Sequence, residues 1–86
     1  MTEDEEFLKK TATKAANILH MPLGDIDPIK LLEMYSCLWV LFGEDEELMR
    51  HWLSTKNNHL GYCPGEHLTD SRMDDILRYL QGMVSH

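Results

Sequence analysis

The clearest feature of the sequence is a set of hydrophobic positions between Pro28 and Gly43 that recurs with helical spacing. The apolar side chains fall at i, i+3 and i+4 intervals; they are Leu31, Leu32, Tyr35, Leu38, Trp39 and Phe42. Asp27 can cap such a helix, a proline is tolerated in its first turn, and a glycine is a typical stop. The pattern predicts a helix over residues 28–42.

Further apolar residues, Met34, Val40 and Leu41, widen this surface beyond a single stripe. A helix that is apolar on more than one side is buried on each of them, either in the core of its own domain or against a second copy of the chain. The pattern leaves both possibilities open. For the dimer interface, the expected residues are Leu31, Met34, Tyr35 and Leu38.

Helical spacing also marks the N-terminal segment. Thr2, followed three residues later by Glu5, has the form of a capping box, in which two side chains satisfy backbone N–H groups at the start of a helix. The helix is expected to run to about Leu19, because Pro22 and Gly24 then stop it.

The acidic run at residues 44–47 predicts the start of a third helix, because carboxylates are favoured near the positive end of the helix dipole. This helix is expected to end near Ser54. Its apolar face consists of Leu48, Met49, Trp52 and Leu53. Residues 55–63 then form a loop, and Pro64 can start a short helical turn through Leu68.

A last helix is expected after this connection, capped by Thr69 or Asp70 and ended by Gly82. Its apolar face consists of Met73, Ile76, Leu77 and Leu80. No segment shows the sustained alternation of a β-strand. The sequence therefore predicts an all-α fold, a compact bundle of about four helices plus a short helical turn, in a single domain over residues 1–86.

The net charge of −7 is spread over both halves of the chain. Residues 1–43 hold four basic and seven acidic residues, a net −3, and residues 44–86 hold four basic and eight acidic residues, a net −4. Nucleic acids are bound chiefly by Lys and Arg that neutralise phosphates. The composition therefore disfavours direct nucleic-acid binding by this chain, and binding to an anionic membrane.

The cysteines and the hydropathy indicate a cytoplasmic protein. Cys37 and Cys63 do not make a disulfide framework, so that we expect reduced thiols. The longest apolar stretch, residues 38–42, is too short to span a bilayer, and no signal peptide is evident.

Three reactive side chains, His59, Cys63 and His67, lie four residues apart and are the candidates for a metal site or a thiol enzyme. A zinc site needs three or four converging ligands, usually in tightly spaced pairs, and the sequence has no such pair, so we expect no metal or cofactor. A Cys–His pair would also need a pocket and an oxyanion site, so we expect no enzymatic activity. His86 can be the remnant of an expression tag.

The loop with Asn57, Gly61 and Pro64 allows two interpretations. Side-chain amides, a glycine and a proline can brace a tight connection between helices, and the same features can form a partner surface. The residue types favour bracing. Trp39 and Trp52 lie on apolar helix faces, where core packing is the default.

A set of residues placed between two predicted helices carries a family resemblance; the set is Trp52, Leu53, Asn57, Leu60, Gly61, Pro64 and Leu68. In order and spacing, residues 31–83 resemble the C-terminal, toxin-binding domain of the Xre/MbcA/ParS antitoxins. Two positions depart from the family pattern, because Tyr62 and Arg72 stand where the family usually has glycine.

The N-terminal residues 1–26 resemble the first helix of the helix-turn-helix region of the same antitoxins. In DNA-binding members a second helix and a recognition helix follow before the toxin-binding part. Here about five residues separate Met21 from Asp27, too few for a recognition helix. The resemblance therefore implies a shortened variant, with residues 27–83 as its toxin-binding part.

The resemblance also implies a partner: a toxin of the RES type that consumes NAD, whose active-site entrance the antitoxin covers with its C-terminal helix. Carried onto this chain, the contact residues are Arg78, Tyr79, Gln81, Met83 and Val84. Arg78 can bind a carboxylate through two hydrogen bonds, and Met83 can fill an apolar pocket. The alternative is a non-enzymatic helical dimerisation or regulatory module without a toxin partner, suggested by the missing recognition helix and the broad apolar surface of residues 29–42.

Overall fold

The structure is a computed structural model that describes residues 3–21, 24, 26–66 and 68–85. Over these residues the predicted all-α fold is confirmed, with four helices. They are α1 (Glu3–Ile18), α2 (Pro28–Phe42), α3 (Glu46–Ser54) and α4 (Asp70–Val84). None of the helices in this described part is long and apolar enough to cross a membrane.

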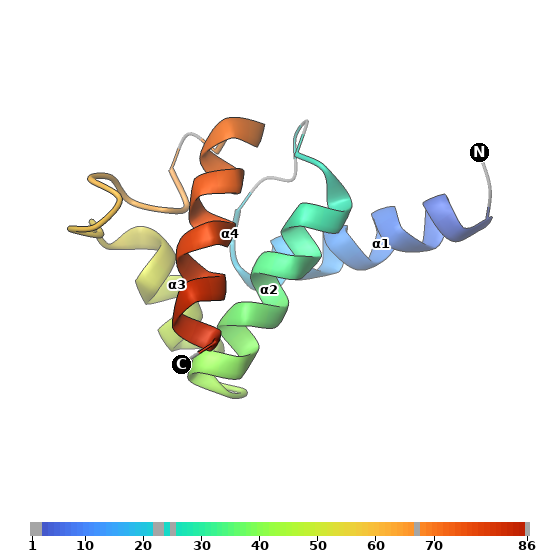
Figure 1. Ribbon diagram of the computed structural model, residues 1–86. Helices are drawn as coiled ribbons and strands as arrows, with labels where there is room; N and C mark the ends of the chain where they lie inside the picture. The colour runs from blue at the N-terminus through green and yellow to red at the C-terminus, as the bar shows by residue number, and fades with distance from the viewer. Residues whose placement is uncertain (1–2, 22–23, 25, 67, 86) are drawn as a thin grey trace.

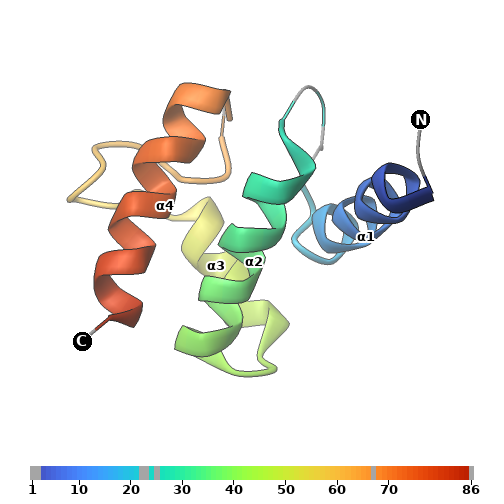
Figure 2. The same cartoon turned by 45° about the vertical axis from the view of Figure 1, so that its right-hand side comes forward.

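α2 is the central element. α1 packs on one side of it and α4 on the other, and α3 makes a smaller contact (Figures 1 and 2). The largest helical side chains that lose all contact with solvent come from α2, α3 and α4; they are Leu31, Met34 and Leu38 of α2, Met49 of α3, and Met73, Ile76 and Leu80 of α4. α1 adds only small residues from its own length, and its N-terminal half extends away from the other helices (Figure 1).

Three helices begin with side-chain caps, and the sequence indicates two of them, Asp27 and Thr69. The side-chain oxygens of Asp27, Asp45 and Thr69 accept hydrogen bonds from backbone N–H groups of the first turn at 2.9, 3.1 and 3.2 Å. Such caps satisfy N–H groups that have no partner inside the helix. Thr69, and not Asp70, is thus the cap of α4. The capping box expected at Thr2 lies outside the described residues.

α1 ends at Ile18, one residue before the expected position, in a Schellman motif. The N–H groups of His20 and Met21 bond back to carbonyls of the last turn at 3.2 and 3.0 Å. His20 takes the left-handed φ of 57° that glycine usually supplies at this point. Arg50 of α3 donates a further hydrogen bond, at 2.9 Å, to the Ile18 carbonyl, which ties the end of α1 to α3.

The predicted end of the last helix at Gly82 is wrong, because α4 continues to Val84. A glycine ends a helix by taking a left-handed φ, and Gly82 is not among the glycines that do so. The helical hydrogen bonding instead carries on past it, since the Ser85 N–H donates to the Gln81 carbonyl at 3.0 Å.

The short helical turn expected from Pro64 is also replaced by other geometry. The Glu66 N–H donates to the Cys63 carbonyl at 3.0 Å, which makes residues 63–66 a single β-turn with Pro64 at its second position. The Gly65 N–H donates outward, to a carbonyl of α3, and so is not available to continue a helix.

The residues expected to form a dimer surface on α2 are mostly internal. Leu31, Met34 and Leu38 are fully buried in the core of a single chain, and Tyr35 is half-buried against it. The assignment of these three residues to a dimer interface is therefore wrong for the folded chain. The apolar side chains that α2 exposes are Ile29, Trp39 and Val40, so that the core position expected for Trp39 is wrong as well.

Candidate partner-binding site

Of the residues that carried the family resemblance, Trp52 and Leu53 lie at the end of α3, and the others lie in the connection between α3 and α4. Asn57 organises its first part: its side-chain oxygen accepts hydrogen bonds from the N–H groups of His59 at 2.8 Å and Leu60 at 3.1 Å. Its backbone carbonyl accepts from Gly61 at 2.7 Å, and its own N–H donates to the Tyr62 carbonyl at 3.1 Å. Residues 57–62 thus form a closed turn held from within.

Gly61 completes this turn in a conformation that suits glycine. Its φ of 85° lies in the left-handed region, where a Cβ atom is unfavourable. The turn therefore depends on two residue types at fixed positions, an amide side chain at Asn57 and a glycine four residues later.

Replacing Asn57 with alanine is expected to lower the free energy of unfolding by about 1–2 kcal/mol, because two hydrogen bonds to backbone N–H groups are lost. The neighbouring Asn58 is exposed, and Asn58→Ala is the matched control, expected to change stability by less than about 0.5 kcal/mol. Urea denaturation of the two variants makes the comparison. Equal effects would show that the turn does not depend on the Asn57 side chain.

The second part of the connection closes on the end of α3. Pro64 is fully buried, and the Gly65 N–H donates to the Leu53 carbonyl at 2.7 Å. Carbonyls in the last turn of a helix lack partners inside that helix, so this bond satisfies one of them. A Cβ atom at Gly65 would lie 3.0 Å from the Leu53 oxygen, which explains why the approach requires glycine.

Aromatic contacts join the connection to α4. Tyr79 stacks on Trp52 of α3 with ring centroids 6.4 Å apart, and it meets the His59 ring edge-on at 5.2 Å. The Arg72 guanidinium lies over the Tyr62 ring, 4.4 Å from its centroid. Such contacts add about 0.5–1.5 kcal/mol each to simple burial. They hold α4 against α3 and the connection at Arg72 and Tyr79, about two helical turns apart.

The Arg72–Tyr62 contact joins the first turn of α4 to the end of the closed turn, with the cation placed against the face of the ring. Among the described residues, the buried Tyr62 hydroxyl has no hydrogen-bond partner. The ring is therefore held by packing and by the guanidinium.

The residues expected to contact a toxin lie on different sides of α4. Arg78 and Gln81 are exposed, and Val84 is 36% exposed near the C-terminus. Met83 is half-buried, and Tyr79 faces the loop that holds it. The outward surface of the last two turns is thus a cation and an amide, with an apolar side chain at its end.

The reactive side chains do not assemble into a catalytic group among the described residues. His59 packs on Tyr79, Cys63 is half-buried in the connection, and His67 lies outside the described part of the chain. Burial raises the pKa of the Cys37 thiol, and the nearby Glu33 adds to the rise. The thiol therefore stays protonated at neutral pH, which makes it a poor nucleophile. No three His, Cys, Asp or Glu residues among those described lie close enough together to hold a metal ion.

Comparisons of the chain with models of protein families, with curated proteins and with solved structures found no match. The site is therefore defined by its own geometry. That geometry is a tightly bonded connection between two helices that holds the inner side of α4 and leaves an outer, polar side exposed to solvent.

Two parts of the site were not predicted from the sequence. The Gly65 contact has a local signal, since a Pro-Gly pair typically marks a turn and not the start of a helix. The contact between Tyr62 and Arg72 has none, because the two residues are ten positions apart and meet only once α4 has packed against the loop.

Proposed function

We propose that this chain is an antitoxin-like protein that binds a RES-type, NAD-consuming toxin and covers its active-site entrance. The residue pattern over 31–83 is the reason for naming this class of partner. The observation that carries the proposal is the arrangement of α4, which exposes Arg78 and Gln81 in its last turns while Trp52 and His59 hold its inner side through Tyr79.

A helix held in this way suits binding by occlusion. Ordering a flexible segment on binding costs free energy, and a helix that is already fixed avoids most of that cost. α4 is also joined to α2 by an ion pair between Lys30 and Asp74, 2.9 Å apart. Arg78 supplies a guanidinium that can bind a carboxylate of the partner through two hydrogen bonds. The proposed activity needs no chemistry from this chain.

Arg78→Glu is expected to weaken binding to a RES-type toxin by roughly tenfold or more, because a charged hydrogen-bonding partner is replaced by one of opposite sign. Titration calorimetry measures the affinity, and growth on co-expression measures neutralisation. Lys9→Glu makes the same change of charge on α1, outside the proposed contact, and is expected to leave both unchanged.

Removing residues 83–86 tests the end of the helix without touching the core, because the fully buried Leu80 is retained. This truncation is expected to reduce neutralisation.

If the full-length chain neither binds the toxin nor restores growth, the proposed function is wrong. If Lys9→Glu weakens binding as much as Arg78→Glu does, the effect is one of net charge and the contact surface lies elsewhere.

The second candidate is a dimerisation or regulatory module without a toxin partner. Large apolar side chains that stay exposed favour it; they are Phe7, Ile29, Trp39, Val40 and Leu48. Light scattering on the purified chain tests this candidate, since a monomer at every concentration would remove the reason to propose it.

A further inference from the structure

α2 buries one side in the core, and its opposite side is open to solvent. Positions on that outward side recur at alternating intervals of four and three residues; they are Ile29, Glu33, Ser36 and Val40. All four are exposed, and Ile29 and Val40 present 51% and 67% of their surface to solvent. Alternating intervals of three and four are the spacing at which one helix packs along another. α2 therefore carries a second seam, which no helix in the described part of the chain covers.

A shallow groove of about 470 Å³ lies along this seam. Five residues of α2 line it, together with Leu8 of α1 and Gln81 of α4. Figure 2 shows α2 between α1 and α4, so that α2 is the floor of the groove and the two neighbouring helices are its walls. The floor includes Ser36 and Cys37, whose small side chains let a second helix approach closely.

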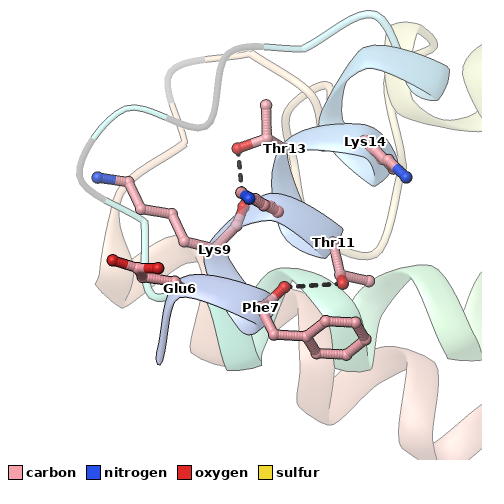
Figure 3. A pocket seen from close by; sticks show the side chains of 7 residues that line it. Glu6, Phe7, Lys9, Thr11, Thr13 and Lys14 are labelled. Carbon is pink, nitrogen blue, oxygen red and sulfur yellow. Dashed lines mark hydrogen bonds between the residues drawn. The ribbon is translucent and has the colours of Figure 1, made fainter. Parts of the chain in front are cut away.

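A second hollow, of about 510 Å³, lies along the outward side of α1. The side chains drawn around it in Figure 3 all come from this one helix. The Phe7 ring and Lys14 point to one side of the helix, and Glu6 and Lys9 point to the other. No second element walls this hollow among the described residues. Because partner helices bind in apolar grooves, the α2 groove is the better candidate for a binding site.

Glu33 is the charged member of the seam. Burial is the main cause of the raised pKa of the Cys37 thiol, and the Glu33 carboxylate is the second cause, which places this charge close to the groove floor. Lys30, one turn before Glu33, is already paired with Asp74 at 2.9 Å. The groove is therefore apolar with a carboxylate in its middle.

We propose that this groove binds an amphipathic helix of a partner protein, which presents apolar side chains to Ile29 and Val40 and a Lys or Arg to Glu33. A helix that covers Glu33 removes its carboxylate from water, and a cation opposite it offsets that cost. A polar residue in a helical seam thereby selects the partner. This inference goes beyond the proposed function, because the groove shares only Gln81 with the surface assigned to the toxin.

Charge disfavours the other occupants of such a seam. Two copies of α2 that met in parallel would set Glu33 against Glu33, and each chain carries a net charge of −7. An anionic membrane would meet the same carboxylate. The length of the seam suits a short helix: from Ile29 to Val40 it extends over about 17 Å, or three turns, which a partner helix of about fourteen residues covers.

A stapled helical peptide of about fourteen residues tests this inference without any toxin, so that the result is independent of the proposed function. Its seam positions are leucine apart from one central lysine, and the matched peptide has glutamate at that position. Fluorescence anisotropy with the full chain measures both affinities. The lysine peptide is expected to bind roughly tenfold more tightly than the glutamate peptide, and Glu33→Lys is expected to reverse this preference.

Two pairs of variants locate the binding on the chain. Glu47→Lys makes the same change of charge as Glu33→Lys, but on α3 and outside the groove, and should leave the preference for the lysine peptide as it is. Val40→Asn should weaken binding of the lysine peptide by roughly tenfold, because an apolar contact with leucine is lost. Phe7→Asn, at a side chain of similar exposure on α1, should leave binding unchanged.

The outcomes separate the possible occupants of the groove. Circular dichroism confirms that each variant keeps its helices. An absence of binding at millimolar peptide, or a Glu33→Lys variant that still prefers the lysine peptide, overturns the inference. Sedimentation equilibrium of the unmodified chain tests for a second copy as the occupant: a dimer that Val40→Asn disrupts overturns the inference in favour of the second candidate function.

Discussion

Leu38→Ala is expected to lower the free energy of unfolding by about 2–5 kcal/mol. Leu38 is fully buried at the centre of α2, the helix that contacts all the others, so its truncation leaves a cavity that the neighbouring helices cannot close. Small domains have a total stability of about 5–15 kcal/mol, so this single change removes a large share of it. Urea denaturation, followed by tryptophan fluorescence, measures the loss.

Val40→Ala supplies the control for this prediction. Val40 lies two residues further along the same helix, but 67% of its surface is exposed. Its truncation is expected to change stability by less than about 0.5 kcal/mol. If instead Leu38→Ala left stability intact and altered only self-association, Leu38 would lie at an interface and not in the core.

The contrast between these two residues shows how much of the fold the sequence could predict. Helical spacing and the Asp27 and Gly43 signals were sufficient to place α2 from Pro28 to Phe42. The same spacing could not decide which part of a broad apolar surface faces inward. That choice depends on where α1, α3 and α4 pack, and it leaves Val40 and Trp39 outside while Leu38 is enclosed.

The sequence could likewise predict only one part of the candidate site. The turn at Asn57 and Gly61 was predictable, because an amide and a glycine stabilise a turn through bonds to residues next to them in the chain. Contacts that bring distant segments together were not predictable. The Tyr79 ring between Trp52 and His59 depends on three separate segments, and no local pattern reports their meeting.

Gly65→Ala is expected to lower the free energy of unfolding by about 1–3 kcal/mol, the usual cost of overpacking. An added Cβ would lie 3.0 Å from the Leu53 carbonyl oxygen and 3.1 Å from the Leu53 Cβ. Neither atom is the end of a flexible side chain, so the β-turn must move away from α3. That movement lengthens the 2.7 Å hydrogen bond from the Gly65 N–H to the same oxygen. Alanine also restricts the unfolded chain, which raises the free energy of unfolding, but this gain is smaller than the combined loss from overpacking and from the lengthened hydrogen bond.

Gly82→Ala is the matched control and is expected to act in the opposite direction. Gly82 lies within α4, its φ is helical, and a Cβ atom there meets nothing within 4 Å. Alanine favours a helix over glycine by up to about 1 kcal/mol, and close to the helix end a gain of about 0.5 kcal/mol is expected. Thermal unfolding of the two variants under one set of conditions compares them. A loss of stability from Gly82→Ala would mean that this glycine ends the helix after all. An unchanged midpoint of thermal unfolding for Gly65→Ala would show that the connection can move away from α3 without loss of stability. Opposite signs at the two glycines would show that the need for glycine at position 65 comes from its close approach to Leu53 of α3.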